Sequence, residues 1–301
     1  GDMDHYLKTA VPNVAIITKI APTHLKYFEN IEGVFAEKSK LAKAVGKGGM
    51  VFLNAQDPYL KKLKGEIRAK VIWFGKGAEG GVKISHFKQN AKGATFRMHW
   101  GGQKATVNWK IIGEHQLMCA YIAATVGINL GLTLKQIAKG LAQTKAPEHR
   151  LNVLEAKNTV IIDDTYNASP SAVVEALKTL AEIGRGRQKI AVLGEMRDLG
   201  NFSQTASEQI GQKVAKSTIN LLICVGRGAQ KIATSAKKAN FKGKIIVAAN
   251  TKQAIGEVKN NLLRKTTVLV KGSRHEHLER VVFALLGKNT NISCYHCGNL
   301  S

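Results

Sequence analysis

The sequence is short of acidic and aromatic residues, and both shortages narrow what the protein can be. It has 21 Asp and Glu against 45 Lys and Arg, which gives a formal net charge of +24 at pH 7. Such a charge attracts nucleic acid, anionic lipid or phosphorylated small molecules. Aromatic residues make up only 6% of the chain, however, and leave little material for stacking bases. Because the basic residues are also spread along the chain, a generally basic, solvated surface is favoured over a nucleic-acid site.

Cysteine is scarce too, with four in the whole chain. Cys224 lies within an apolar run, which predicts a buried thiol, and the four show no spacing typical of a disulfide framework. Cys294 and Cys297 flank His296 in a short polar tail. A zinc site normally has four ligands, and no second pair is near. Two free thiols in a loose tail are therefore favoured over a zinc site.

Long hydrophobic runs are absent, and none approaches the length that spans a bilayer. The first five residues are polar and acidic, unlike an export signal, so the sequence favours a cytoplasmic protein. Its 301 residues and 44% hydrophobic content suffice for two domains, each with its own core.

Five short apolar runs, each followed by a helical pattern, occupy the second half of the chain. They lie at residues 160–162, 190–193, 221–225, 245–248 and 268–270. Continuous runs rich in β-branched residues are typical of strands buried on both faces. Strands that alternate with helices predict a parallel, doubly wound, Rossmann-like sheet.

The first half is mixed. We expect strands at 14–17 and 50–53, a helix at 34–45, antiparallel hairpins between 70 and 109, and helices at 115–130 and 134–142. Residues 144–148 are the expected linker. The prediction is an α/β protein with one domain at 1–147 (a parallel sheet plus a small antiparallel part), a second at 148–287, and a tail at 288–301.

Three polar clusters follow strands of the second domain, at 163–167, 194–198 and 271–274. Ligands of open α/β sheets collect beyond the carboxyl ends of the strands. Carboxylates there can bind a ribose hydroxyl or a metal, and Lys or Arg can bind phosphate. The last cluster is also expected to open a helix, whose N-terminus attracts anions. Asp164 and Asn167 could instead be turn and capping residues, but three clusters at one edge favour binding.

Seven segments resemble, in order, signature segments of the Mur ligase family. Residues 163–170 read Asp-Asp-Thr-Tyr-Asn-Ala-Ser-Pro, 192–200 read Val-Leu-Gly-Glu-Met-Arg-Asp-Leu-Gly, and 270–274 read Val-Lys-Gly-Ser-Arg. The others lie at 18–25, 53–58, 113–116 and 149–153. The segment at 163–170 resembles the signature of the family branch that adds D-alanyl-D-alanine, and the likeness to the family extends to about residue 287.

The resemblance implies an ATP-dependent amide ligase of peptidoglycan precursor synthesis. ATP would phosphorylate the carboxylate of UDP-N-acetylmuramoyl-tripeptide, and the amine of D-alanyl-D-alanine would attack the acyl phosphate. Mg²⁺ and cationic side chains would neutralise charge on the transferred phosphoryl group. The lack of a long apolar run and the scarcity of aromatic residues also lead us to expect no membrane partner, and disfavour a nucleic-acid partner.

The resemblance further implies roles for individual residues. His24 and Lys38 would be catalytic and would ligate Mg²⁺, Lys38 as a carbamate. The ATP-binding set would be Asn54, His115, Arg150, Asp164 and Asn167. The substrate cleft would contain Lys271, Ser273 and Arg274.

The sequence also departs from the family. No Gly-Lys-Thr phosphate-binding loop is present, and Lys19, Lys26, Cys119 and His149 stand where the family has asparagine, glutamate, asparagine and often glycine. We expect a fragment of a longer enzyme that cannot use ATP alone. A split enzyme whose partner supplies the loop, or a degenerate homologue, are the alternatives. A basic nucleic-acid-binding module and another Mur or folylpolyglutamate synthase-type ligase are the other functions to weigh.

Overall fold

The structure is a computed structural model that describes residues 2–21 and 28–290. Internal contacts divide the chain into two compact units. Unit 1 comprises Gly1–Lys88, Ala94–Trp109 and His115–Thr144, and unit 2 comprises Gln89–Gly93, Lys110–Glu114 and Lys145–Ser301. No helix within the described ranges is long and apolar enough to cross a membrane.

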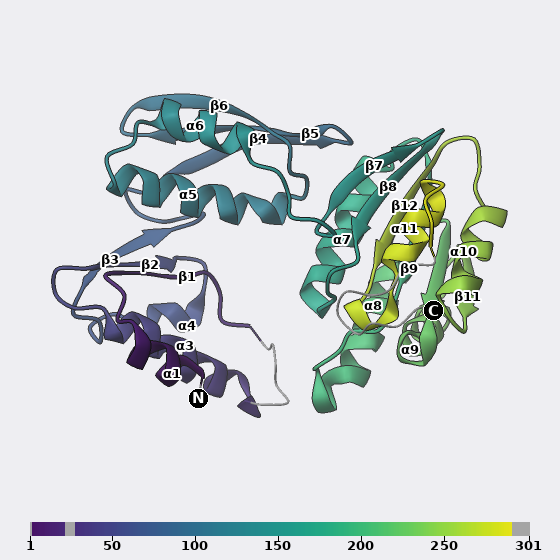
Figure 1. The fold of residues 1–301 in the computed structure, drawn as a ribbon, viewed down its shortest axis with the longest axis horizontal. Helices are drawn as coiled ribbons and strands as arrows, with labels where there is room; N and C mark the ends of the chain where they lie inside the picture. The colour runs from purple at the N-terminus through teal and green to yellow at the C-terminus, as the bar shows by residue number, and fades with distance from the viewer. Residues whose placement is uncertain (1, 22–27, 291–301) are drawn as a thin grey trace. The chain divides into compact units, whose positions relative to one another are not determined.

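Unit 1 opens with a three-stranded parallel sheet in the order β1-β2-β3 (Figure 1). The strands are β1 (Val14–Ile17), β2 (Met50–Asn54) and β3 (Lys70–Phe74), and the helices are α1 (Asp2–Thr9), α3 (Ile31–Ala44) and α4 (Pro58–Lys61). Asn30 caps α3 by accepting from the Gly33 N–H, and Asp57 caps α4 ahead of a proline in its first turn. The two expected strands are present, and the helix expected at 34–45 begins three residues earlier.

The two faces of this sheet are covered unequally. Ala15, Ile17 and Leu53 point into a core with Val34 of α3. Phe52 points to the opposite face, where it packs with residues of α5. On that second face Val14 and Ile16 of β1, in register with Met50 and Phe52, remain 41% and 37% exposed.

The antiparallel part of unit 1 has the order β4-β5-β6, as the alternating pattern predicts. It begins only at Lys83, however, so the expectation of hairpins from residue 70 was wrong for β3, which pairs parallel with β2. Its strands are β4 (Lys83–Asn90), β5 (Gly93–Trp100) and β6 (Gln103–Trp109), followed by α5 (Leu117–Asn129) and α6 (Leu134–Gln143). Thr133 and Gln136 form a reciprocal capping box at the start of α6. The Trp109 indole N–H donates to the Thr144 hydroxyl at 2.7 Å and ties the end of β6 to the end of α6.

Unit 2 contains a six-stranded sheet in the order β11-β10-β9-β12-β8-β7. The strands are β7 (Asn152–Ala156), β8 (Thr159–Asp164), β9 (Gln188–Leu193), β10 (Leu221–Val225), β11 (Lys244–Ala248) and β12 (Thr266–Lys271). All five predicted apolar runs are strands of this sheet. The five predicted strands pair in parallel, as expected. Strand β7 is an additional edge strand that the sequence pattern did not predict, and it pairs antiparallel with β8. Only a two-residue turn, with Lys157 at φ +50°, separates β7 from β8.

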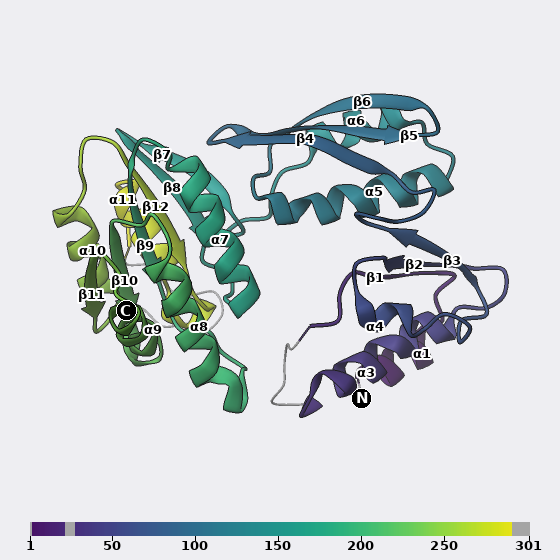
Figure 2. The ribbon, with the colours of Figure 1, turned by 180° about the vertical axis from the view of Figure 1, so that it is seen from behind.

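Helices cover both faces of the large sheet (Figures 1 and 2). They are α7 (Pro170–Ile183), α8 (Ser203–Ala215), α9 (Gly226–Lys238), α10 (Thr251–Asn260) and α11 (Glu279–Leu285). Helices α7, α8 and α9 share a core with Ile162 and Leu269, whereas α10 and α11 share the opposite core with Ile161 and Val270. Because side chains alternate along a strand, Asp164 and Lys271 lie on the α7 side and Asp163 on the α11 side.

Candidate functional site

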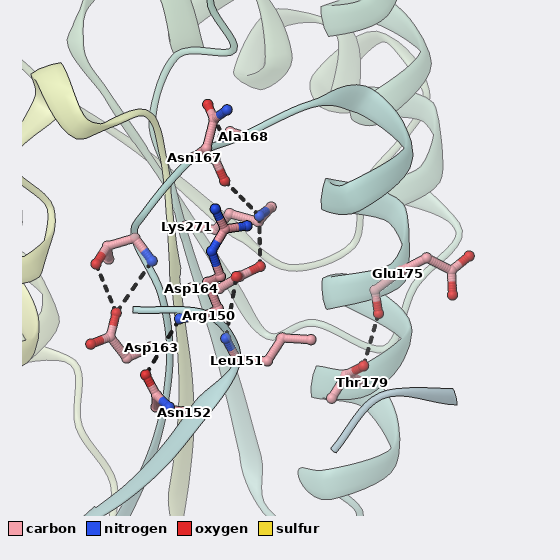
Figure 3. A network of polar contacts seen from close by, with 11 residues as sticks. Arg150, Leu151, Asn152, Asp163, Asp164, Asn167, Ala168, Glu175, Thr179 and Lys271 are labelled. Carbon is pink, nitrogen blue, oxygen red and sulfur yellow. Dashed lines mark hydrogen bonds and ion pairs between the residues drawn. The ribbon is translucent and has the colours of Figure 1, made fainter. Parts of the chain in front are cut away.

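The polar edge of the unit 2 sheet is centred on Lys271, the last residue of β12. Its register partner on β8 is Asp164. The ammonium donates to Asp164 Oδ2 at 2.6 Å and to the Asn167 carbonyl at 2.9 Å (Figure 3). The Lys271 side chain is 2% exposed and that of Asp164 13%. The structure thus brings together three residues that the sequence places at this edge.

The Asp164 carboxylate also holds the segment that precedes strand β7. Asp164 Oδ1 accepts from the Leu151 N–H at 3.3 Å (Figure 3). Leu151 and His149 both have left-handed backbones, at φ +53° and +61°, which are unfavourable for residues other than glycine. Asn167 uses its side-chain oxygen to accept from the Ala168 N–H. The loop ends around Asp164 are therefore fixed by hydrogen bonds as well as by packing.

Two arginines stack on the tyrosine of the same loop. The guanidinium carbons of Arg150 and Arg274 lie 3.8 and 3.6 Å from the centroid of the Tyr166 ring. Cation–π contacts of this kind hold a guanidinium in place while its N–H donors can still bind a ligand. With Ser273, which is buried, they form a cationic rim beside Lys271. Sequence reasoning placed both arginines here but did not foresee that Tyr166 joins them.

The third polar cluster does not open an α-helix, and that expectation was wrong. Residues after Lys271 form a single 3-10 turn, Arg274–Glu276, which ends at His277 in a left-handed conformation before α11 begins. Three residues of 3-10 helix carry little dipole, because the dipole is a sum over aligned peptides. Anion binding at this edge would therefore depend on Lys271 and the two arginines.

The second polar cluster places Glu195 against the start of α9. A Cβ at Gly228 would lie 2.3 Å from the Glu195 carboxyl carbon, so only glycine permits this approach. Burial, and then the nearby Glu195 carboxylate, raise the pKa of Glu276, with Arg197 opposing. This part of the edge is acidic, whereas the part around Lys271 is basic.

A second pair, the half-buried His149 with the buried Asp163, lies on the opposite side of β8. His149 Nδ1 is 2.8 Å from Asp163 Oδ2, and Asp163 Oδ1 accepts from the backbone N–H and hydroxyl of Thr165. The hydrogen bond to Asp163 raises the pKa of His149, and burial opposes that shift. Sequence reasoning noted His149 only as a departure from glycine and missed its partner.

This pair predicts a stability that depends on pH. Because the folded pKa of His149 is raised above the ordinary value of about 6.5, its contribution is complete below about pH 6.5 and is lost as pH rises through the folded pKa. We expect urea unfolding to show this loss on the alkaline side. His149→Asn, which tolerates φ > 0 and does not titrate, should remove it. An unchanged pH profile in that variant would assign the effect to other groups.

The candidate residues of unit 1 surround the loop after β1. The Lys38 ammonium donates to the Lys19 carbonyl at 3.0 Å, and the Asn54 amide donates to the Thr18 carbonyl at 2.9 Å. Burial lowers the pKa of Lys38, and the Asp57 carboxylate raises it by less. Asp57 Oδ2 accepts from the Ile20 N–H at 2.6 Å. The side chains of Lys38 and Asn54 thus both contact the backbone of the loop that follows β1.

His24 lies outside the described residues, as do Lys26 and the Cys294–Cys297 pair. His115 lies in unit 1, in the 3-10 turn Glu114–Gln116. No three His, Cys, Asp or Glu side chains gather to hold a metal ion within residues 2–21 and 28–290. Both oxygens of Asp57 accept backbone N–H groups, so its part in this loop is structural. The described residues alone therefore do not complete a Mg²⁺ site.

Comparison with protein families gives two matches. The model of the Mur ligase middle domain matches residues 1–127, and that of the Mur ligase glutamate ligase domain matches residues 149–274. Together they cover most of the chain, and the gap between them contains the expected linker.

Curated relatives match the chain over almost its whole length. The UDP-N-acetylmuramoyl-tripeptide--D-alanyl-D-alanine ligase of Buchnera aphidicola is 29% identical over 289 residues, covering 95% of this chain and 61% of the relative. That of Escherichia coli is 28% identical over 294 residues, covering 96% and 64%. The chain therefore spans about three fifths of the length of these relatives.

Solved structures agree. A MurF structure from Acinetobacter baumannii superposes with a TM-score of 0.83 at 25% identity, covering 95% of this chain and 62% of that one. The MurF ligase of Thermotoga maritima in complex with ADP gives 0.82 at 26% identity, covering 96% and 65%. With two consecutive domain models matched and these likenesses in fold, the chain belongs to the Mur ligase family.

Proposed function

We propose that this chain forms the middle and C-terminal domains of an ATP-dependent ligase that adds D-alanyl-D-alanine to UDP-N-acetylmuramoyl-tripeptide. The convergence of Asp164, Asn167 and Lys271 at the carboxyl edge of the sheet supports it most directly, because this edge is where α/β sheets bind ligands. The relatives that match carry the name of this activity, and one related structure contains ADP. The use of ATP would place the reaction in the cytoplasm.

The reaction has two balanced steps. A carboxylate oxygen of the tripeptide attacks the γ-phosphorus of ATP, which breaks the bond to the bridging oxygen and yields an acyl phosphate and ADP. The amine of D-alanyl-D-alanine then attacks the acyl carbon, expels phosphate, loses a proton and forms the amide. Arg150 and Arg274, held by Tyr166, are suited to phosphate binding because a guanidinium offers several directed donors. Ser273 would add a hydroxyl, and Asp164 would accept from the ribose.

Lys38 would act as a carbamate. Carbon dioxide reacts with a neutral amine, and burial lowers the pKa of Lys38, which increases the neutral fraction at a given pH. The carbamate would be an anionic oxygen ligand of the kind that Mg²⁺ prefers, and with His24 it would serve the ATP phosphates. Asn54 and His115 belong to the proposed ATP-binding set in the same unit.

A further polypeptide segment would complete unit 1. Strand β1 pairs only with β2 among the described residues, so its outer edge can accept another strand. Val14 and Ile16 are exposed beside the buried Phe52, although parallel sheets are normally covered on both faces. The relatives are longer than this chain. A segment that adds a strand to β1 and covers these two side chains would carry the phosphate-binding loop.

Nucleotide binding is tested with Arg150→Gln. Loss of one charge-assisted hydrogen bond, worth about 1.5–3 kcal/mol, should weaken ATP binding measured by calorimetry by at least about tenfold. Arg185→Gln is the matched control, because Arg185 is also exposed in unit 2 but lies at the end of α7. Equal affinities for both variants, or salt-sensitive binding of DNA with none of ATP, would refute the proposed site.

The chemical step is tested by phosphate release with both substrates present. We expect no phosphate release from this chain by itself, because its sequence contains no Gly-Lys-Thr phosphate-binding loop. Turnover that appears once the preceding segment is supplied, and disappears in Lys38→Ala, would support the proposed roles. Turnover without that segment would contradict the need for it.

A further inference from the structure

A cavity of about 710 Å³ opens in unit 2 beside the edge strand β7. Its wall contains the apolar side chains Val153, Leu154, Phe283 and Leu286. Leu154 and Leu286 are partly buried against the α11-side core. Val153, the neighbour of Leu154 in β7, packs against the α7-side core instead. The apolar side of the cavity on the α11 side is therefore formed by Leu154, Phe283 and Leu286.

The charged residues around this cavity are mostly cationic. The lysines are Lys92, Lys110, Lys145 and Lys288, all within unit 2, and the carboxylates are Glu148 and Asp163. Of these two carboxylates, Asp163 is already paired with His149, which leaves Glu148 to offset the charge of the lysines. Four lysines against it give the cavity a positive potential, which walls of low dielectric strengthen.

Several of these groups are held in place. The N–H of Lys288 donates to the Phe283 carbonyl at 2.9 Å after Gly287 turns left-handed at φ +70°, which is a typical helix ending. The Asn152 amide donates to the Ala146 carbonyl and ties the linker to β7. His149 packs edge-on against Phe283, with ring centroids 6.2 Å apart. When the imidazole is protonated, it donates to Asp163 through Nδ1 and has a second N–H at Nε2.

The cavity and the edge at Lys271 do not share their charged residues. Asp163, which lines it, is next to Asp164 in β8, and adjacent side chains in a strand point to opposite faces. The α7-side core lies under Asp164 and the α11-side core under Asp163. None of Asp164, Asn167, Lys271 and Arg274 is among the lining residues. Leu151 lines the cavity, and its N–H donates to Asp164 Oδ1, so the two sites adjoin at this residue, and competition with ATP tests whether they are separate.

We propose that this cavity binds an organic anion: a molecule with a phosphate or carboxylate for the lysines and His149, and an apolar body for the wall formed by Leu154, Phe283 and Leu286. A bare inorganic anion would leave the apolar wall in water, and a neutral aromatic would leave the lysines without a partner. The combination selects molecules that have both parts. This site is independent of the proposed ligase activity.

The test uses 1-naphthyl phosphate as the probe and calorimetry on the full chain at low salt. We expect Lys145→Gln/Lys288→Gln to weaken binding on the order of tenfold, because two nearby cations are lost. The matched control is Lys213→Gln/Lys237→Gln, which removes two exposed lysines from α8 and α9 with the same change in net charge. Leu154→Ala should weaken the probe a few-fold by removing apolar contact, and should leave inorganic phosphate unaffected.

Three results would overturn the proposal. If both double variants lose affinity equally, the probe is attracted by the net charge alone. If inorganic phosphate or 1-naphthol binds as tightly as the probe, the two parts of the cavity do not act together. If saturating ATP displaces the probe, or if Lys145→Gln/Lys288→Gln weakens ATP, the cavity belongs to the nucleotide site. Perturbation of the His149 ring signals by the probe in NMR spectra, without ATP competition, would support it.

Discussion

Replacing Lys271 by methionine should lower the free energy of unfolding by about 3–5 kcal/mol. The substitution leaves the Asp164 carboxylate at the sheet edge without its cation, and leaves the Asn167 carbonyl without its donor. A charge that is 13% exposed cannot regain its hydration while the strand remains folded. Urea unfolding at pH 7 measures the loss.

The double variant Lys271→Met/Asp164→Asn is the control for this prediction. Asparagine keeps an oxygen that can accept from the Leu151 N–H but carries no charge, so the double variant should be more stable than Lys271→Met. If the single variant falls within about 1 kcal/mol of the original chain, which is typical of a surface ion pair, the pair is not desolvated as described. If the double variant is the less stable of the two, the cost comes from lost packing and not from an unpaired charge.

Replacing Gly211 by alanine should also destabilise unit 2, by about 2–3 kcal/mol. Gly211 lies in α8 where that helix meets α9, and a Cβ there would be 2.7 Å from the backbone nitrogen of Ala236 and from the carbonyl oxygen of Ile232. Backbone atoms in a neighbouring helix cannot turn aside as a flexible side chain can, so the helices must separate. Thermal unfolding of the variant measures the cost.

Gly256→Ala is the control in the same unit, and we expect it to raise stability where Gly211→Ala lowers it. Gly256 lies within α10, and no atom comes within 4 Å of a Cβ placed there. Alanine should stabilise that helix by about 0.5–1 kcal/mol through backbone propensity alone. If both variants change stability in the same direction, the close contact between α8 and α9 is not what requires glycine at 211.

The buried strands were predictable because a strand covered on both faces must be apolar at every position, as in Leu221–Val225. Strand β7 could not be predicted in this way, because an edge strand such as Asn152–Ala156 is only half-buried and its sequence resembles that of a linker. Helix α1 has no buried residue in Asp2–Thr9, so no apolar stripe marks it. The order of strands in the sheet depends on long-range packing that no local pattern records.

The site was predictable to the same extent. A pattern of strands and polar ends is enough to place Asp164 and Lys271 at one edge. Alternation along β8 also separates Asp163 from Asp164, and this signal could have pointed to a second site. The pairing of Asp163 with His149 and the contact of Arg274 with Tyr166 could not be foreseen, because each depends on where a distant loop turns.

The position of β12 bears on how the chain is made. It is the last strand in sequence among the described residues, yet it lies between β8 and β9, which begin 107 (266 − 159) and 78 (266 − 188) residues earlier. Until β12 has been synthesised, the backbone N–H and C=O groups of β8 and β9 that pair with it have no partner strand. The sheet can be completed only after β12 has been synthesised. A chain truncated before β12 would lack the central strand that joins β8 to β9.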